Sequence, residues 1–236
     1  MATVKVVFIP NPGRNTYSGP RDYRPISLTP FLLKTMDRLA DRYLRDKALA
    51  IVPLHPNQHA YQAGKSVETA LPQLIIRVEK VFDQQEIALG AFLDIERAFN
   101  NTCYDTTCDA LVRHGSEYTI MRRIKVTLEG CVAVATLNET SLGFAISGGC
   151  PQRGVLSPLL WCMVVNDLLT KPSGGGVFIQ GYADDICLLT VGEFPNTVSG
   201  FMQWALSTIE IWCNEVRLSV NPDKTGLVAF TRKRKL

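Results

Sequence analysis

Two adjacent aspartates interrupt an otherwise apolar stretch of this sequence. Asp184 and Asp185 stand in the middle of IQGYADDICLLT, Ile179 to Thr190. Apolar residues on both sides are typical of two short buried strands, so we expect the pair at the tip of a tight hairpin, where a carboxylate loses least solvation. Asp is also a common turn residue that hydrogen-bonds its own backbone, so a plain turn is the alternative interpretation.

A third aspartate follows another apolar run. In IALGAFLDIERAF the nearly continuous apolar residues are typical of a strand covered on both faces, and Asp94 stands where polar residues begin. Three carboxylates on one sheet edge repel one another unless a cation lies between them. Oxygen ligands suit Mg²⁺, and two such ions about 4 Å apart would support an in-line phosphoryl transfer. Arg24 and the SGGCPQRG loop would supply donors for the phosphates.

The composition is that of a globular protein with a core. The chain has 236 residues, of which 46% are hydrophobic. No apolar run approaches the roughly 18 residues of a membrane span, and the N-terminal MATVKVVFIP lacks a signal-peptide cleavage site. We therefore expect an intracellular protein, in the nucleus or the cytoplasm, with no membrane partner.

Seven cysteines are scattered along the chain without a CxxC pair, which is typical of a reduced intracellular protein. Cys103 and Cys108, joined by His55 or His59, are the one hint of a zinc site. Their spacing fits no common zinc pattern, so we interpret the cysteines as small core residues.

The net charge of +3 is unevenly distributed, because basic residues outnumber acidic ones in the first 47 residues and the chain ends in TRKRKL. Such regions suit a polyanionic partner. For Arg38, Arg42 and Arg45 we prefer the other interpretation, the solvated face of an amphipathic helix.

Periodicity and turn residues predict a mixed α and β chain. A strand is expected over VKVVFIP, and a loop over NPGRNTYSGPRDYRP. Thr29 would cap a helix whose apolar face is Leu32, Met36, Leu39 and Tyr43. A second helix would begin near Ser66, with Pro72 marking a kink or the true start. Further helices are expected over 105–114 and 116–129, from Ser157 and around Phe201, Ala205, Ile209 and Trp212, and hairpins over CVAVATLNETSLGFAI and around Asp184.

Successive blocks of the sequence resemble the reverse transcriptases, most closely those of jockey-like non-LTR retrotransposons. The blocks stand in the family's order and cover nearly the whole chain: VVFIPNPGR, YRPISLTPFLLKTMDRL, HPNQHAYQAGKSVETAL, FLDIERAFNN, GGCPQRGVLSPLLW, YADD and LSVNPDKTGLVAF. YADD alone is a weak signal, whereas the ordered set is specific.

The resemblance implies an α+β right-hand polymerase with fingers, and with an antiparallel palm sheet that carries the three aspartates. A fingers-rich part would span about residues 1–88 and a palm-rich part about 89–236. The implied activity is RNA-directed DNA polymerisation, with two Mg²⁺ ions, or Mn²⁺ in their place. The implied partners are an RNA template, a DNA primer and deoxynucleoside triphosphates.

The resemblance also implies roles for single residues. Asp94 and Asp184 would be the principal metal ligands, with Asp185 as the third carboxylate. Phe99 would lie under the sugar of the incoming nucleotide and exclude a 2′-hydroxyl, and Arg24 would hold the triphosphate. Ordinary interpretations remain open, because Phe99 is also a typical core aromatic and Arg24 a typical loop arginine.

Further residues complete the implied site. Gln152 and Gly154 match the block that lines the nucleotide and template pocket, and Lys224 matches a lysine proposed to protonate the leaving pyrophosphate. Ile95 would be a metal and substrate contact, and Tyr182 and Ala183 would contact substrate. Gln152 and Lys224 are equally interpretable as ordinary turn residues.

The sequence departs from the family in places. Asn11 stands where a lysine is usual, three residues before Arg14, and Asn100 stands where an acidic residue is frequent. Most of the thumb and the flanking endonuclease and zinc-knuckle segments are not recognised, so a fragment or a decayed copy is expected. The alternatives are an inactive remnant that at most binds nucleic acid, and a maturase polymerase of the group II intron type.

Overall fold

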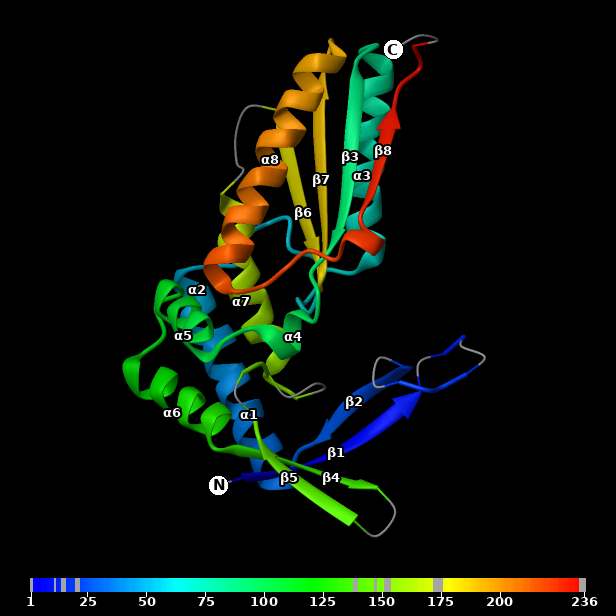
Figure 1. Cartoon of the computed structure of the whole chain (residues 1–236). Helices are drawn as coiled ribbons and strands as arrows, with labels where there is room; N and C mark the ends of the chain where they lie inside the picture. Colours follow the sequence, from blue (N-terminus) through cyan, green and yellow to red (C-terminus); the bar gives the residue numbers. More distant parts are fainter. Residues whose placement is uncertain are drawn as a thin grey trace. The chain divides into compact units, whose positions relative to one another are not determined.

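The computed structural model describes residues 2–10, 12–13, 16–19, 22–137, 140–146, 148–150, 154–171 and 176–233. Asn11, Arg14 and Gln152 lie outside the described residues. The chain divides into two compact units, each built from two segments (Figure 1). The first unit contains Met1–Pro53 and Phe99–Leu160, and the second contains Leu54–Ala98 and Trp161–Leu236. Within the described ranges, every helix is too short or too polar to cross a membrane.

The first unit contains a four-stranded sheet of order β2-β1-β4-β5. β1 pairs in parallel with β4 and antiparallel with β2, and β4 pairs antiparallel with β5. Val4 and Val6 are buried whereas Lys5 and Val7 are exposed, which is the alternation of a strand with one covered face. The strands are β1 (Ala2–Pro10), β2 (Tyr23–Leu28), β4 (Cys131–Leu137) and β5 (Thr140–Ala145).

The predicted strand over VKVVFIP is confirmed by β1, and the hairpin that begins at Cys131 is confirmed by β4 and β5. The predicted loop was too long, because Tyr23, Arg24 and Pro25 belong to β2 and pair with β1. Pro25 is compatible with a strand here because β2 is an edge strand, where a residue that cannot donate to the ladder is tolerated.

Helix α1 (Phe31–Tyr43) exists as predicted, but its cap and its apolar face differ from the prediction. Pro30 occupies the N-cap position, and the Thr29 hydroxyl is buried with no hydrogen-bond partner among the described residues. Leu32 and Leu39 are 74% and 60% exposed. Helical spacing admits several neighbouring faces, and tertiary packing rather than periodicity determines which one is covered.

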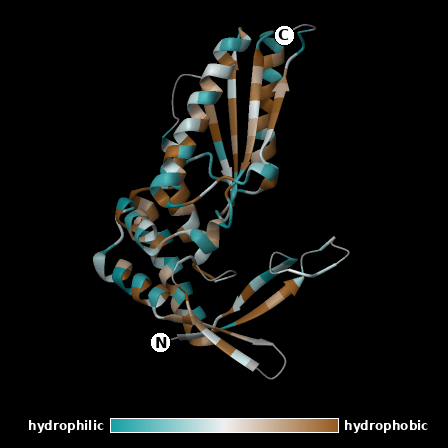
Figure 2. Cartoon of the chain, in the orientation of Figure 1, coloured by the Kyte–Doolittle hydropathy of each residue, from teal (hydrophilic) through white to brown (hydrophobic). Residues whose placement is uncertain are grey.

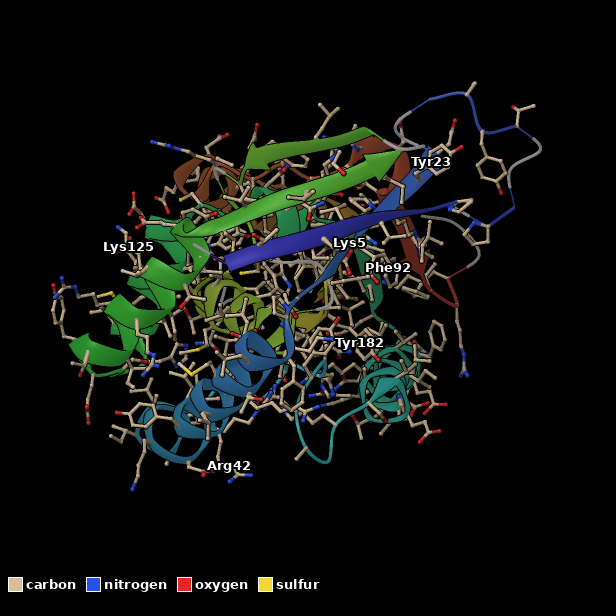
Figure 3. The ribbon with its side chains drawn as sticks, turned by 90° about the horizontal axis from the view of Figure 1, so that it is seen from below. Lys5, Tyr23, Arg42, Phe92, Lys125 and Tyr182 are labelled. Carbon is tan, nitrogen blue, oxygen red and sulfur yellow. The ribbon has the colours of Figure 1, made fainter. Side chains whose placement is uncertain are left out.

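The helices predicted over 105–114, over 116–129 and from Ser157 are confirmed, whereas the short helical segments over 44–51 and 98–101 were not predicted. Arg42 points away from the unit (Figure 3) and Arg45 pairs with Asp41 at 2.9 Å, which supports the solvated face preferred for the basic residues of this region. The elements are η2 (Leu44–Ala48), a π-helical turn, α2 (Leu49–Ile51), α4 (Ala98–Asn101), α5 (Tyr104–Arg113), α6 (Tyr118–Glu129) and the first turn of α7 (Ser157–Thr170).

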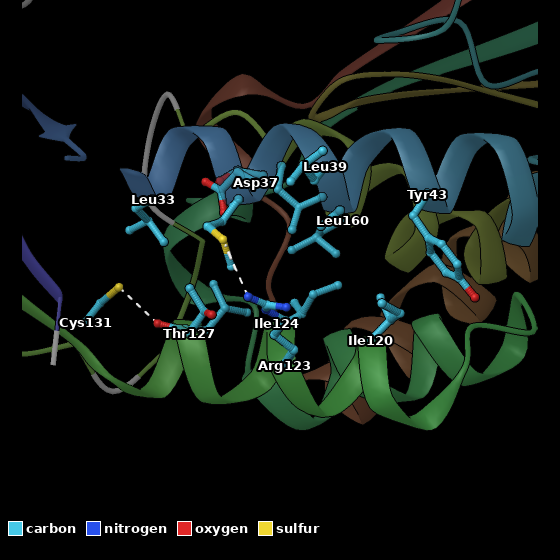
Figure 4. A pocket seen from close by; sticks show the side chains of 15 residues that line it. Leu33, Asp37, Leu39, Tyr43, Ile120, Arg123, Ile124, Thr127, Cys131 and Leu160 are labelled. Carbon is cyan, nitrogen blue, oxygen red and sulfur yellow. Dashed lines mark hydrogen bonds between the residues drawn. The ribbon is translucent and has the colours of Figure 1, made fainter. Parts of the chain in front are cut away.

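A cavity of about 200 Å³ lies between α1 and α6 (Figure 4). Its walls are mainly apolar, and a guanidinium nitrogen of Arg123 contacts the Met36 sulfur at 3.5 Å. Asp37 also lines the cavity. Burial raises the pKa of Asp37 to about 6, because an apolar surrounding disfavours the charged carboxylate.

The second unit contains an antiparallel sheet of order β6-β7-β3-β8. Helix α3 packs against one face, where Val81 joins Ala88, Phe178 and Leu189 in a buried cluster. Helix α8 packs on the other face, where Thr190 donates to the Val198 carbonyl. The apolar strands between these helices are visible in Figure 2. The elements are β3 (Ile87–Asp94), β6 (Val177–Tyr182), β7 (Asp185–Gly192), β8 (Gly226–Phe230), α3 (Val67–Asp83), α8 (Pro195–Val216) and the 3₁₀ turn η3 (Pro222–Lys224).

The predicted strand that ends at Asp94 and the predicted hairpin around Asp184 are both confirmed. Ser66 caps α3 as part of a capping box with Thr69, so this helix begins where it was predicted. Pro72 lies inside α3 and does not mark its start.

Candidate active site

The three aspartates lie at the same end of the second unit's sheet. Asp94, the last residue of β3, is directly opposite Asp185, the first residue of β7. Tyr182 is also opposite Asp185, so Ala183 and Asp184 alone form the turn of the β6–β7 hairpin. Together with Lys224, these aspartates line one open cavity of about 680 Å³.

Backbone hydrogen bonds fix the two strand ends to each other. The Ile95 amide donates to the Asp184 carbonyl at 3.1 Å, and the Ile95 side chain is buried. Ala183 has a left-handed backbone with φ 55°, which a tight turn requires and which a residue with a Cβ adopts only at some cost. The surrounding structure, rather than the backbone preference of Ala183, therefore stabilises this turn.

The carboxylates influence one another electrostatically. Partial burial and the neighbouring charges of Asp184 and Asp94 raise the pKa of the Asp185 carboxyl, and the Lys224 ammonium opposes this shift. Lys224 Nζ lies 3.1 Å from Oδ2 and 3.3 Å from Oδ1 of Asp94, whose side chain is 14% exposed. The cation in contact with Asp94 is therefore the Lys224 ammonium.

Two aromatic residues beside the turn were missed by sequence reasoning. The indole of Trp161, 2% exposed, donates to the Ala183 carbonyl at 2.7 Å, so it anchors the residue before Asp184. Tyr61 has a left-handed backbone, and partial burial, with a further contribution from the charge of Asp184, raises the pKa of its phenol. A buried Trp normally finds an acceptor for its N–H, which was the one available signal.

Three predicted site residues belong to the first unit. Arg24 is exposed on β2 opposite Ile9, Phe99 is half-buried in α4, and Gly154 is buried. Gln152 lies outside the described residues. The structure thus gathers Asp94, Ile95, Tyr182, Ala183, Asp184, Asp185 and Lys224 in the second unit, and it describes the other three within the first.

The glycine-rich segment of the first unit contacts the backbone of α4. The Cys150 amide donates to the Phe99 carbonyl, and the Gly149 amide donates to the Thr102 carbonyl, both at 2.7 Å. Gly149 has φ 81°, and a Cβ at this position would lie 2.5 Å from the Asn100 carbonyl oxygen. Only glycine permits this approach.

The described part of the chain offers few candidates for metal ligands. Within it, no three or more His, Cys, Asp or Glu side chains are arranged so as to hold a metal ion, and this includes Asp94, Asp184 and Asp185, of which Asp94 is paired with Lys224. His59 bonds Thr69 and Gln73, and the Cys103 sulfur accepts from the Thr106 amide, so these candidates for a zinc site have other partners. All seven cysteines are free of disulfide bonds.

Comparison with known proteins identifies the family. Residues 9–235 match the family described as reverse transcriptase (RNA-dependent DNA polymerase), so the chain belongs to the reverse transcriptase family. It is 29% identical over 97% of its length to a probable RNA-directed DNA polymerase from transposon BS of Drosophila melanogaster. It is 28% identical, also over 97%, to the polymerase from mobile element jockey of Drosophila funebris. The chain spans only about a quarter of these relatives, 26% and 25% of their lengths.

Solved structures show the same fold. Apo telomerase of Candida tropicalis, truncated from its C-terminal domain, matches 99% of this chain and 51% of its own with a TM-score of 0.68 at 12% identity. A telomerase of Candida albicans in complex with a fragment of telomeric RNA matches 97% of this chain and 43% of its own with a TM-score of 0.66. The predicted α+β polymerase fold with an antiparallel sheet is confirmed.

Proposed function

We propose that this chain is the polymerase domain of a retrotransposon reverse transcriptase, which adds deoxynucleotides to a DNA primer on an RNA template. The single observation that carries the proposal is the pairing of Asp94 with Asp185, which brings Asp184 to the same cavity in a chain of the reverse transcriptase family. The telomerase relative solved with RNA supports an RNA template. The sheet of the second unit is the palm in this proposal.

The residues of the cavity fit divalent metal ions in their chemistry. Asp94, Asp184 and Asp185 offer only oxygen ligands. Burial raises the pKa of Asp185 most, and the repulsion by Asp184 and Asp94 that adds to this shift is one that a cation would relieve. With the Ile95 carbonyl, the three carboxylates would hold two Mg²⁺ ions, or Mn²⁺ in their place. These ions would activate the primer hydroxyl and stabilise the leaving oxygen. Lys224 would release Asp94 to the metal and then lie close to the pyrophosphate.

The remaining proposed roles concern the nucleotide. Phe99 would exclude the 2′-hydroxyl, and Arg24 would bind the triphosphate through charge-assisted hydrogen bonds. Tyr182, the last residue of β6, and Ala183, the first residue of the hairpin turn, would contact the primer end or the nucleotide. Gly154 and Gln152 would line the nucleotide and template pocket. The fingers-rich part would cover about residues 1–88 and the palm-rich part about 89–236, and each compact unit combines segments of both.

Primer extension on an RNA template with Mg²⁺ tests this function. The wild-type chain should extend the primer with deoxynucleotides, and Asp184→Asn, which removes one ligand charge at nearly constant shape, should abolish extension. Asp223→Asn is a matched control, because Asp223 is exposed in the nearby turn η3 and is outside the proposed ligand set. Equal extension by wild type and Asp184→Asn would refute the assigned site.

A further inference from the structure

Strand β6 forms one edge of the second unit's sheet and leads directly into the turn that carries Asp184. The backbone of residues 57–59 lies along this edge. Gln58 forms a parallel bridge with Gly181, the His59 amide donates to the Gly181 carbonyl at 2.9 Å, and the Gly181 amide donates to the Asn57 carbonyl at 3.0 Å. These bonds satisfy backbone groups that an edge strand otherwise leaves unpaired.

A chain of side-chain hydrogen bonds connects the same strand to helix α3. Asn57 Nδ2 donates to the Ile179 carbonyl at 2.8 Å, Gln73 Nε2 donates to Asn57 Oδ1 at 3.0 Å, and Gln73 Oε1 lies 2.7 Å from His59 Nε2. A backbone carbonyl only accepts, so it orients the Asn57 amide and, through it, the Gln73 amide. We therefore assign the His59 proton to Nε2, which donates to Gln73.

His59 is the buried end of this hydrogen-bond network. It is 5% exposed, whereas Asn57 and Gln73 are partly exposed. Because the His59 ring is buried, a shift between the segment and α3 that broke its bond to Gln73 would leave a buried ring nitrogen unpaired, at a cost in free energy. The network therefore fixes the position of β6 along α3.

Hydrogen bonds within residues 56–65 also stabilise this segment. The Gln58 carbonyl accepts from Gln62 Nε2 at 2.7 Å and from Lys65 Nζ at 3.0 Å, and Lys65 Nζ also donates to the Pro56 carbonyl. Side-chain hydrogen bonds thus connect residues within 56–65. They hold the backbone of the segment that pairs with Gly181.

A close approach completes the contact between this segment and β6. A Cβ at position 181 would lie 2.7 Å from Oε1 of Gln58, which is 0% exposed. Because the Gln58 amide is fully buried, it is not free to swing into solvent. Glycine at position 181 therefore allows the segment to lie directly on β6.

We propose that the side chains of Asn57 and Gln73, together with the backbone at Gln58, hold β6 and thereby fix the Asp184 turn for metal binding. The proposal rests on the proposed function, because it assigns Asp184 to catalysis. On its β7 side the hairpin is held by the pairing of Asp185 with Asp94, and on its β6 side it is held by this segment. A misplacement of about 1 Å in a catalytic group costs roughly a hundredfold in rate.

The first experiment breaks the side-chain network without touching the hairpin. Gln73→Leu, in the full 236-residue chain, removes both hydrogen bonds of the Gln73 amide. We expect the kcat of primer extension to fall about tenfold to a hundredfold, with the KM for deoxynucleotide changed less than about twofold. The Gly181 amide should exchange with solvent deuterium at least about tenfold faster. Gln84→Leu is the matched control, since Gln84 is exposed at the C-terminal end of α3.

The second experiment is a double-mutant cycle on the close approach. Gly181→Ala should lower kcat and accelerate exchange at the hairpin amides, and adding Gln58→Ala should restore both, because it vacates the space that the new Cβ needs. Each variant's thermal midpoint is measured in parallel. Recovery of kcat and amide protection in the double variant distinguishes positioning from a general loss of stability.

The two proposals fail in different ways. A wild-type chain that extends no primer would contradict the proposed function. Amide exchange would still measure how firmly residues 57–59 hold β6. Unchanged Gly181 exchange in Gln73→Leu, or a loss in Gly181→Ala that Gln58→Ala does not relieve, would overturn the positioning role. So would loss of hairpin protection in Gln73→Leu with full kcat in an active enzyme.

Discussion

Lys224 Nζ and Asp94 Oδ2 lie 3.1 Å apart, so the lysine and the proposed metal compete for the same carboxylate. The ion pair is built locally, because the Asn221 amide donates to the Asp94 carbonyl at 2.8 Å and the Asn221 side chain caps the turn η3 that carries Lys224. The Lys224 side chain is 64% exposed, so it can move away from Asp94 at little cost. This pair is therefore suited to opening when a metal ion binds.

Lys224→Met should lower the Mg²⁺ concentration required for half-maximal primer extension, because Asp94 no longer has an ammonium to exchange. A severalfold decrease corresponds to an interaction of about 1 kcal/mol, which is ordinary for an exposed ion pair. If Lys224 also protonates the leaving pyrophosphate, kcat should fall about a hundredfold at saturating Mg²⁺. Lys80→Met, at an exposed position of α3, controls for the loss of one positive charge. A Lys224→Met variant that requires more Mg²⁺ than wild type would contradict the competition.

Asp37 should make stability depend on pH. Its raised pKa means that the folded protein holds the proton more tightly than the unfolded chain. This contribution to stability is complete below about pH 4, near the ordinary carboxyl pKa, and is lost as the pH rises through the folded value of about 6. Because Asp37 is only half-buried, solvent screening limits the effect to about 1 kcal/mol.

Asp37→Asn removes this titration and should be more stable than wild type at pH 7.5 by about that amount. The difference should vanish near pH 4. The measurement is the free energy of unfolding in urea at several pH values, with Asp46→Asn as the control at an exposed position shortly after α1. A constant difference between Asp37→Asn and wild type across this range would contradict the raised pKa.

Elements with local signals were predictable from the sequence. The apolar run that ends in Asp94 and the hairpin around Asp184 gave their strands directly, since buried strands and tight turns depend on neighbouring residues. The opposition of Asp94 and Asp185 was not encoded locally, because register depends on strands far apart in the sequence. The sequence predicted that the three carboxylates would lie on one sheet edge, and the structure shows that Asp94 pairs with Asp185.

Features that depend on distant partners were missed or mistaken. Arg24 and Pro25 have the composition of a loop, and only pairing with β1 makes them part of a strand. The contact of Trp161 with Ala183 and the chain from Gln73 through Asn57 have no periodic signal, because amide and indole groups are placed by single hydrogen bonds. Such interactions are visible in the structure but could not be predicted from the sequence.

Gly149→Ala should destabilise the first unit. The substitution places a Cβ 2.5 Å from a backbone oxygen and forces a residue with a side chain into φ 81°. We expect a loss of more than about 2 kcal/mol, because backbone strain and a contact with an immovable atom add together. Gly200→Ala in α8 is the opposite case, since nothing lies within 4 Å of its Cβ, and it should stabilise by about 0.5–1 kcal/mol. Urea unfolding of both variants measures the two effects, and equal stability of Gly149→Ala and wild type would disprove the close contact.

Phe99→Val should relax the choice of sugar. In the proposed site the phenyl ring would lie where a 2′-hydroxyl would otherwise fit. A steric clash discriminates by rejecting the wrong substrate rather than by binding the right one more tightly. A smaller side chain should therefore admit ribonucleotides, with kcat/KM for them rising at least about tenfold, while deoxynucleotide incorporation stays within a few fold of wild type. The backbone contact of Phe99 with Cys150 does not involve the ring, so the glycine-rich segment should keep its place in the variant. Phe194→Val, at a 62% exposed position before α8, serves as the control for the same change in size. If the ratio of ribonucleotide to deoxynucleotide incorporation is the same in Phe99→Val and Phe194→Val, the ring does not select the sugar, and Phe99 is only a packing residue of the first unit.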